Sequence, residues 1–178
     1  MKVINFFGAP SSGKSTQAAG LFYEMKRNGD SVELINEFPK QCVWEGHINL
    51  LEDQLYVLGQ QHRQQARLEG KVTYCITDSP VLLSPIYRDV YEQVMYTEQL
   101  ITQAATDCFN KYRNINIFMR ICPDDFQEKG RAQDLKQCIE IDQRIEDMLK
   151  SMGLDYMEAN FTDPSTFPGR FRTYVKQR

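Results

Sequence analysis

Between residues 8 and 15 the chain reads Gly8-Ala9-Pro10-Ser11-Ser12-Gly13-Lys14-Ser15, and Thr16 comes next. This stretch fits the phosphate-loop pattern G-x-x-x-x-G-K-[ST] without a mismatch. The two glycines let the backbone curl with its N–H groups pointing inward, toward the β- and γ-phosphates of a nucleotide. Lys14 is expected to reach those phosphates, and the Ser15 hydroxyl is expected to bind Mg²⁺. The motif therefore predicts an ATP site that extends from Gly8 to Thr16.

Segments typical of strands and of helices alternate around this loop. Apolar stretches predict strands over residues 3–7, 32–36, 72–77, 115–119 and 154–158. Apolar periodicity predicts helices over residues 14–28, 46–69, 88–111 and 134–152. Glu37-Phe38-Pro39 is predicted as a loop, because proline interrupts a helix or a ladder, and no element is assigned after Thr162. Such alternation is typical of βαβ units that build a parallel sheet in an α/β fold.

The composition narrows the classes of protein to consider. With 178 residues the chain is long enough for one α/β domain and too short for two, so we expect a single domain. A formal net charge of −3 argues against a strongly basic nucleic-acid-binding surface but leaves a local basic groove open. No export signal or membrane-spanning stretch is recognised, so no membrane partner is expected. The five cysteines form no C-x-x-C pair, which predicts reduced thiols in the cytoplasm.

Two carboxylates directly follow predicted strands. Glu37 comes after residues 32–36, and Asp78 comes after residues 72–77. Ligands of open α/β sheets bind beyond the carboxyl ends of the strands. Transfer of a phosphoryl group to a hydroxyl needs a carboxylate near the attacking oxygen. We therefore expect Asp78 to orient Mg²⁺ or to act as the base, and Glu37 is the other candidate base; a helix cap or a turn acid is the alternative for each.

Two arginines are candidates for stabilising the transferred phosphoryl group. Arg120 follows the predicted strand 115–119, and Arg131 lies in a predicted lid loop over about residues 122–133. Both would add positive charge to the transition state. A structural ion pair is the alternative for Arg120, and a surface position is the alternative for Arg131.

The acceptor side is predicted from an amide and two aromatic residues. Gln54 shares a helical face with Leu58 and Gln61, and an amide can read the edge of a base with a donor and an acceptor. Phe38 and Trp44 would stack on a flat acceptor, or else belong to the core. The chain lacks an NKxD guanine signature and the long strand ending in Asp-Glu of ATPase motors, and these absences favour a small kinase.

Taken together, these segments resemble a family of P-loop kinases found mainly in bacteriophages and related to deoxynucleoside kinases and to nicotinamide-riboside-kinase-like ATPases. The resemblance covers most of the chain and rests on GAPSSGKST followed by AAGLFYEMK, Asn36-Glu37 leading to Val43-Trp44-Glu45, Asp53-Gln54 with Gln61-His62, Ile76-Thr77-Asp78-Ser79-Pro80, and Lys129-Gly130-Arg131. It implies a three-layer fold with a five-stranded parallel sheet in the order 2-3-1-4-5. It also implies that the glutamate at position 37 serves as the base.

Some members of that family phosphorylate the hydroxymethyl group of 5-hydroxymethyluracil in DNA. The resemblance therefore implies an ATP- and Mg²⁺-dependent DNA kinase, with a kinase of a free nucleoside or nucleotide as the alternative. A nucleotide-dependent regulatory ATPase is the alternative from another class. Contact with DNA would need a basic rim, for which the candidates are Arg120, Lys129, Arg131, Arg170, Arg172, Lys176 and Arg178.

Overall fold

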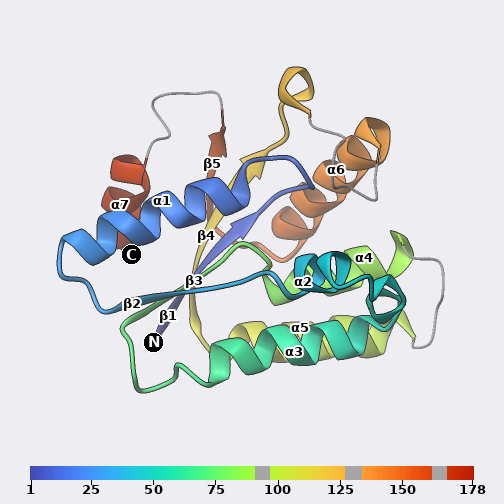
Figure 1. Ribbon diagram of the computed structural model, residues 1–178, viewed down its shortest axis with the longest axis horizontal. Coiled ribbons are helices and arrows are strands. Elements are labelled where there is room, and N and C mark those ends of the chain that lie inside the picture. Colours follow the sequence, from blue (N-terminus) through green and yellow to red (C-terminus); the bar gives the residue numbers. More distant parts are fainter. Residues whose placement is uncertain (91–96, 127–133, 162–167) are drawn as a thin grey trace.

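A five-stranded, wholly parallel sheet forms the centre of the protein (Figure 1). The computed structural model describes residues 1–90, 97–126, 134–161 and 168–178. The strands lie in the order β2-β3-β1-β4-β5, as the resemblance implied. Their bounds are β1 Lys2–Phe7, β2 Val32–Ile35, β3 Tyr74–Thr77, β4 Arg113–Arg120 and β5 Tyr156–Asn160.

Helices cover both faces of this sheet. The α-helices are α1 Lys14–Arg27, α2 Phe38–Trp44, α3 Gln54–Ala66, α4 Ser84–Val90, α5 Glu98–Asn110, α6 Leu135–Ser151 and α7 Pro168–Gln177. Short 3₁₀ turns cover Ile48–Glu52, Val81–Leu83 and Pro123–Asp125. In Figure 1, α1 and α7 lie on one side of the sheet, and α3, α4, α5 and α6 lie on the other.

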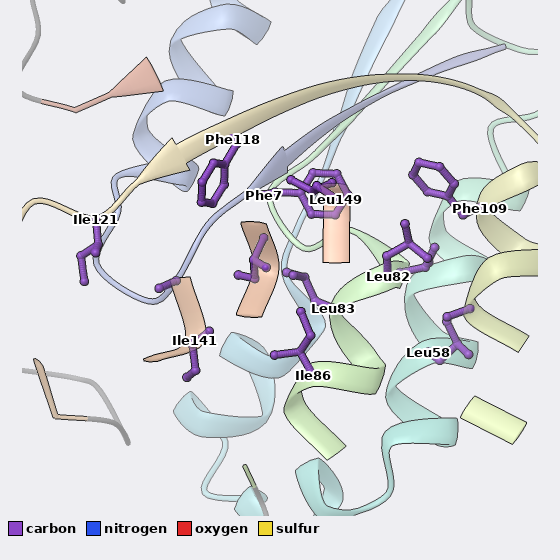
Figure 2. Close-up of a cluster of buried hydrophobic side chains, with 14 of the residues drawn as sticks. Phe7, Leu58, Leu82, Leu83, Ile86, Phe109, Phe118, Ile121, Ile141 and Leu149 are labelled. Carbon is purple, nitrogen blue, oxygen red and sulfur yellow. The ribbon is translucent and has the colours of Figure 1, made fainter. Parts of the chain in front are cut away.

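The two faces of the sheet are buried in separate apolar clusters. Alternate residues of β1 point to opposite faces, so that Phe6 packs with α1 and α7 whereas Phe7 packs with α3 to α6. Figure 2 shows the second cluster, in which Phe7 and Phe118 of the sheet meet side chains from four helices. Burial on both faces explains why the strands read as nearly continuous apolar runs.

Pro39 stands inside a helix, and the prediction of a loop was wrong for Phe38 and Pro39. The helix α2 begins at Phe38, with Pro39 in its first turn. The first turn of a helix has no partner for its N–H groups, so a proline there loses no hydrogen bond and supplies a favourable φ angle. The rule that proline ends a helix applies only to later turns.

The helix predicted over residues 46–69 is interrupted. A 3₁₀ turn ends at Glu52, and α3 begins only at Gln54. The side chain of Asp53 accepts a hydrogen bond from the Tyr56 N–H at 2.9 Å and so caps α3. Asp53 therefore starts a new helix instead of continuing the earlier turn.

Two other helical predictions need correction. The stretch predicted as one helix over residues 88–111 overlaps two helices: the last residues of α4, which starts at Ser84, and all of α5, which starts at Glu98. Residues 168–177, to which no element was assigned, form α7. The helix predicted from residue 134 is confirmed, because Asp134 and Gln137 form a capping box at the start of α6.

Two properties of the whole chain bear on its chemistry. All five cysteines are free thiols, and burial raises the pKa of the Cys75 thiol to about 12. Within the described ranges, no helix combines the length and the apolar character needed to cross a bilayer.

Candidate active site

The loop between β1 and α1 has the tight backbone that its glycines permit. Gly8 and Gly13 have φ angles of +144° and +82°, and Ser11 also lies at a positive φ of 67°. A Cβ on Gly8 would lie 2.6 Å from the Ser12 Oγ and even closer to the carbonyl oxygen of Met119. The loop therefore packs directly against the end of β4, at a distance that only glycine allows.

The lysine of the loop folds back onto the loop itself. Lys14 Nζ donates a hydrogen bond to the Ala9 carbonyl oxygen at 2.6 Å, and the Ser12 N–H donates to the same oxygen at 3.3 Å. These bonds close the loop into a ring. The first turn of α1 contains no acidic residue, so no carboxylate of this turn neutralises the positive end of the helix dipole. Such a ring at a helix start suits a phosphate group.

A cavity of about 330 Å³ lies beside this loop. Its walls come from α1, from the end of β2, from α2 and from the residue after β3, and they are formed by Ser15, Ala19, Leu34, Ile35, Asn36, Glu37, Lys40, Gln41, Trp44 and Asp78. Four predicted site residues therefore line one cavity although they are separated widely in the sequence: Ser15, Glu37, Trp44 and Asp78. The parallel sheet brings them together, because β1, β2 and β3 all end at this edge.

The two carboxylate residues that line the cavity, Glu37 and Asp78, lie in different local structures. Glu37 immediately precedes α2, in extended backbone. Asp78 follows β3 and is only 7% exposed. Within the part of the chain that the structure describes, its Oδ1 atom has no hydrogen-bond partner. A buried carboxylate oxygen without a protein partner is suited to a ligand or a hydrated cation.

Of the four residues predicted to bind the acceptor, two line the cavity and two do not. Trp44 lines it with Glu37, and its side chain is exposed, at 77%. Phe38 packs edge-on against Tyr56, with ring centroids 5.6 Å apart. Gln54, the first residue of α3, is buried, and its Nε2 donates to the Leu51 carbonyl oxygen at 2.7 Å. This contact occupies the amide nitrogen, and Gln54 does not line the cavity, so base reading by Gln54 stays a prediction.

Sequence reasoning missed several polar residues near the two carboxylates. Lys40 and Gln41 line the cavity from α2, and their common face was hidden because the start of this helix was assigned to a loop. Gln61, which shares the α3 face with Gln54, donates through Nε2 to the Ser79 hydroxyl, next to Asp78. The helical spacing of the glutamines was the signal, but it did not distinguish which amide lies beside Asp78.

Arg120 is engaged by three carboxylates. Its Nη1 lies 3.4 Å from Asp142 and 2.9 Å from Glu146, and its Nη2 lies 3.1 Å from Glu158. Hydrogen bonds from Arg120 and Lys150 lower the pKa of Glu146 to about 2. These contacts favour the alternative interpretation of Arg120 as part of a structural ion-pair network. Arg131, the other predicted arginine, lies outside the described residues, as does most of the predicted lid loop.

The predicted basic rim is not assembled by the C-terminal residues. Lys176 pairs with Asp30, which precedes β2, and its ammonium lies over the ring of Tyr74, at the start of β3. Arg178 binds Asp155 at 2.9 Å, before β5. These positions lie at the amino ends of the strands, whereas the phosphate loop lies at their carboxyl ends. Placing Lys176 and Arg178 on the rim of the site was wrong, because α7 turns back along α1.

An exposed aromatic ring lies against the phosphate loop. A Cβ on Gly13 would lie 2.5 Å from Cδ2 of Phe161, the residue that follows β5. No sequence pattern indicates this contact, because it depends on β5 ending next to the loop. Among the described residues, no three His, Cys, Asp or Glu side chains gather into a metal site. Any metal here would therefore depend on ligands such as Ser15, Asp78 and the phosphates themselves.

Comparisons with known proteins agree with this architecture. Residues 3–166 match the family described as AAA domain. Among solved structures, deoxyadenosine kinase from M. mycoides with bound dATP is similar at 18% identity and a TM-score of 0.62, over 99% of this chain and 100% of that one. The same kinase with the products dCMP and a flexible dCDP has 20% identity and a TM-score of 0.64, over the whole of both chains. No curated protein matches the sequence. At these identities the structural likeness shows a shared P-loop kinase fold.

Proposed function

The chain belongs to the AAA domain family, and from the geometry of its site we propose that it is a kinase that transfers the γ-phosphoryl group of ATP to a hydroxyl of a nucleoside-like acceptor. The observation that carries this proposal is the cavity that Ser15 of the phosphate loop shares with Glu37 and Asp78. A nucleotide-dependent switch needs a phosphate loop but no second carboxylate facing an acceptor-sized space. The cavity therefore favours a kinase over a regulatory ATPase.

The residues present fit a magnesium ion. The Ser15 hydroxyl and the Asp78 carboxylate are hard oxygen ligands, and one oxygen of Asp78 is buried without a partner in the described part of the chain. Mg²⁺ is commonly held by one or two such groups together with substrate phosphates. When bound, the ion would neutralise charge on the β- and γ-phosphates.

The remaining chemistry is positioning and proton transfer by the chain itself. Lys14 leaves the Ala9 carbonyl and binds the phosphate oxygens. The acceptor oxygen forms a bond to the γ-phosphorus as the bond to the β–γ bridging oxygen breaks, which releases ADP. The hydroxyl proton passes to Glu37 or Asp78, the two carboxylates of the cavity. Arg131 keeps its proposed role of closing over ATP.

The surroundings of the cavity favour a small acceptor over DNA. A volume of about 330 Å³ lies at the low end of ligand pockets and suits one nucleoside. Lys176 and Arg178, which would have bound a DNA backbone, lie at the other end of the sheet. Arg120 is already paired with carboxylates. We therefore place a free nucleoside or nucleotide first as the acceptor. The second candidate is 5-hydroxymethyluracil in DNA, and the observation in its favour is the exposed Trp44 at the cavity, on which a neighbouring base of the DNA would stack.

A transfer assay distinguishes these acceptors. The protein is incubated with Mg²⁺ and ATP labelled at the γ-phosphate, together with free deoxynucleosides, deoxynucleoside monophosphates, unmodified DNA, or DNA that contains 5-hydroxymethyluracil. We expect label on a free nucleoside or monophosphate. Label that appears only on the modified DNA would reverse the order of the two acceptors. ATP hydrolysis without label on any acceptor would favour the regulatory ATPase.

Variants assign the residues. Lys14→Ala should abolish transfer, and wild-type activity in that variant would exclude the site. Glu37→Gln and Asp78→Asn are compared at saturating ATP: the base loses turnover while ATP binding is kept, whereas a magnesium ligand also weakens Mg-ATP binding. Glu45→Gln is the matched control, since Glu45 lies next to Trp44 but is exposed and outside the cavity wall. A carboxylate whose amide variant turns over like this control is not the base.

A further inference from the structure

Asp142 is a buried carboxylate that the proposed reaction does not use. It lies on α6 and is only 3% exposed. Its Oδ1 accepts a hydrogen bond from the Ile121 N–H at 3.3 Å, and its Oδ2 lies 3.4 Å from Arg120 Nη1. Ile121 directly follows β4, the strand whose end packs against Gly8. Asp142 therefore joins α6 to the edge of the sheet that carries the phosphate loop.

The same carboxylate reaches the phosphate loop itself. Burial raises the pKa of Asp142, whereas hydrogen bonds from the backbone of Ile121 and Ala9 and the charges of Arg120 and Lys14 lower it. Ala9 is thus held from two sides, because its carbonyl oxygen accepts from Lys14 at 2.6 Å and its N–H faces Asp142.

Apolar packing surrounds this contact. Ala9, Ile121 and Ile141 belong to one buried cluster. In Figure 2, Ile121 lies beside the loop that joins β1 to α1, and Ile141 of α6 lies below this loop. A carboxylate placed among such residues loses its hydration, which is costly unless its hydrogen bonds compensate. Packing alone at this position would favour an apolar side chain.

We propose that Asp142 is a positioning residue for the phosphate loop, which holds the Ala9 N–H from the α6 side so that the loop keeps its ring shape when Lys14 leaves the Ala9 carbonyl for a phosphate. This inference rests on the proposed function in one respect, that the loop binds a nucleotide. It adds a residue on a distant helix that touches neither ATP nor the acceptor. Without Asp142, moving Lys14 to the phosphate would leave Ala9 with only the hydrogen bond from the Ser12 N–H, at 3.3 Å.

Glu146 provides a matched control. It lies one turn further along α6, and its Oε2 is 2.9 Å from the same Nη1 atom of Arg120. Glu146→Gln and Asp142→Asn each remove one negative charge from Arg120, but only Asp142→Asn changes the group that faces Ala9. A purely structural role through Arg120 predicts the same effect for both variants.

The experiment is titration calorimetry with Mg-ATP on the wild type and both variants, at a temperature at which circular dichroism shows all three to be folded. We expect Asp142→Asn to weaken binding about tenfold, as for loss of a charged hydrogen-bond partner, and Glu146→Gln to change it less than threefold. In turnover, the KM for ATP should rise in Asp142→Asn while the KM for the acceptor stays unchanged. Equal binding by Asp142→Asn and the wild type, or equal losses in both variants, would overturn the inference.

Two further results complete the test. If the wild type fails to bind Mg-ATP, the proposed function itself fails, and this inference with it; if only the acceptor assay fails, the inference stands. Should Asp142→Asn not fold, amide hydrogen exchange of the wild type takes its place. The Ala9 N–H is expected to stay protected from exchange when Mg-ATP binds, and its loss of protection on binding would overturn the role of Asp142.

Discussion

Replacement of Gly8 by alanine tests whether the phosphate loop depends on its contact with β4. The residue has a φ of +144°, a region that side chains rarely adopt, and holding alanine at a positive φ costs about 1–2 kcal/mol. The added Cβ would also lie 2.6 Å from the Ser12 Oγ and closer still to the Met119 carbonyl oxygen, which is backbone and cannot rotate away. Overpacking of this kind costs about 1–3 kcal/mol. The two costs together give a loss of about 2–5 kcal/mol in the free energy of unfolding.

Gly70→Ala is the control for this change. Gly70 also has a positive φ, of +74°, but a Cβ there would meet no atom of the described residues within 4 Å. Its alanine variant should therefore lose only the conformational cost, about 1–2 kcal/mol. Gly13→Ala is intermediate, because the nearest atoms to its Cβ belong to the side chain of Phe161, which is partly exposed, and not to the backbone.

Thermal unfolding and calorimetric binding of Mg-ATP measure these effects. For a chain of this size each kcal/mol lowers the Tm by about 2–4 °C, so Gly8→Ala should melt about 4–20 °C below the wild type. It should also bind Mg-ATP more weakly, because the loop must move away from β4. A Gly8→Ala protein that melts within about 2 °C of the wild type and binds Mg-ATP equally well would refute the argument.

Three other predictions follow from single contacts. Trp44 is the only tryptophan and is exposed at the cavity, so its fluorescence should change when the acceptor binds. Trp44→Ala should raise the KM for the acceptor and leave the Tm unchanged. An unchanged KM would show that Trp44 is not part of the acceptor site. The pKa of Glu146 is lowered from 4.5 to about 2. The ionised side chain therefore stabilises the fold fully above pH 4.5, and this stabilisation is lost as the pH falls through 2. Urea unfolding should show that Glu146→Gln is destabilised relative to the wild type at about pH 6 and much less at about pH 3. Pro39 stands in the first turn of α2, so Pro39→Ala should lower the free energy of unfolding in urea by about 0.4–1 kcal/mol, whereas a stabilised variant would contradict the helical assignment.

Short-range sequence patterns predicted much of the fold. The phosphate-loop motif between a strand and a helix, together with the alternation of apolar stretches, predicted a parallel α/β sheet, and the sheet is present. Its strand order was implied only by the family resemblance. The errors also had local causes. Pro39 was treated as a helix breaker although the first turn tolerates it, and Asp53 was not recognised as a cap that divides one periodic stretch into two elements.

The candidate site was predictable only in part. The position of Glu37 and Asp78 after strands suggested that they share an edge of the sheet, and they do line one cavity. The sequence could not show which glutamine lies near them, because Gln54 and Gln61 lie on the same face of one helix. Gln54 is bound to Leu51, whereas Gln61 binds Ser79 beside Asp78.

By itself, the sequence determined the loop, because a glycine-rich turn before a helix is built from consecutive residues. Only the tertiary structure decided what surrounds the loop. Arg120 meets carboxylates 22, 26 and 38 residues away, and the helix that carries Lys176 turns back to the far end of the sheet. The charge of an arginine or lysine is encoded at one position, but the partner that neutralises it is set by how distant helices pack, and this decides whether the charge is left for a ligand.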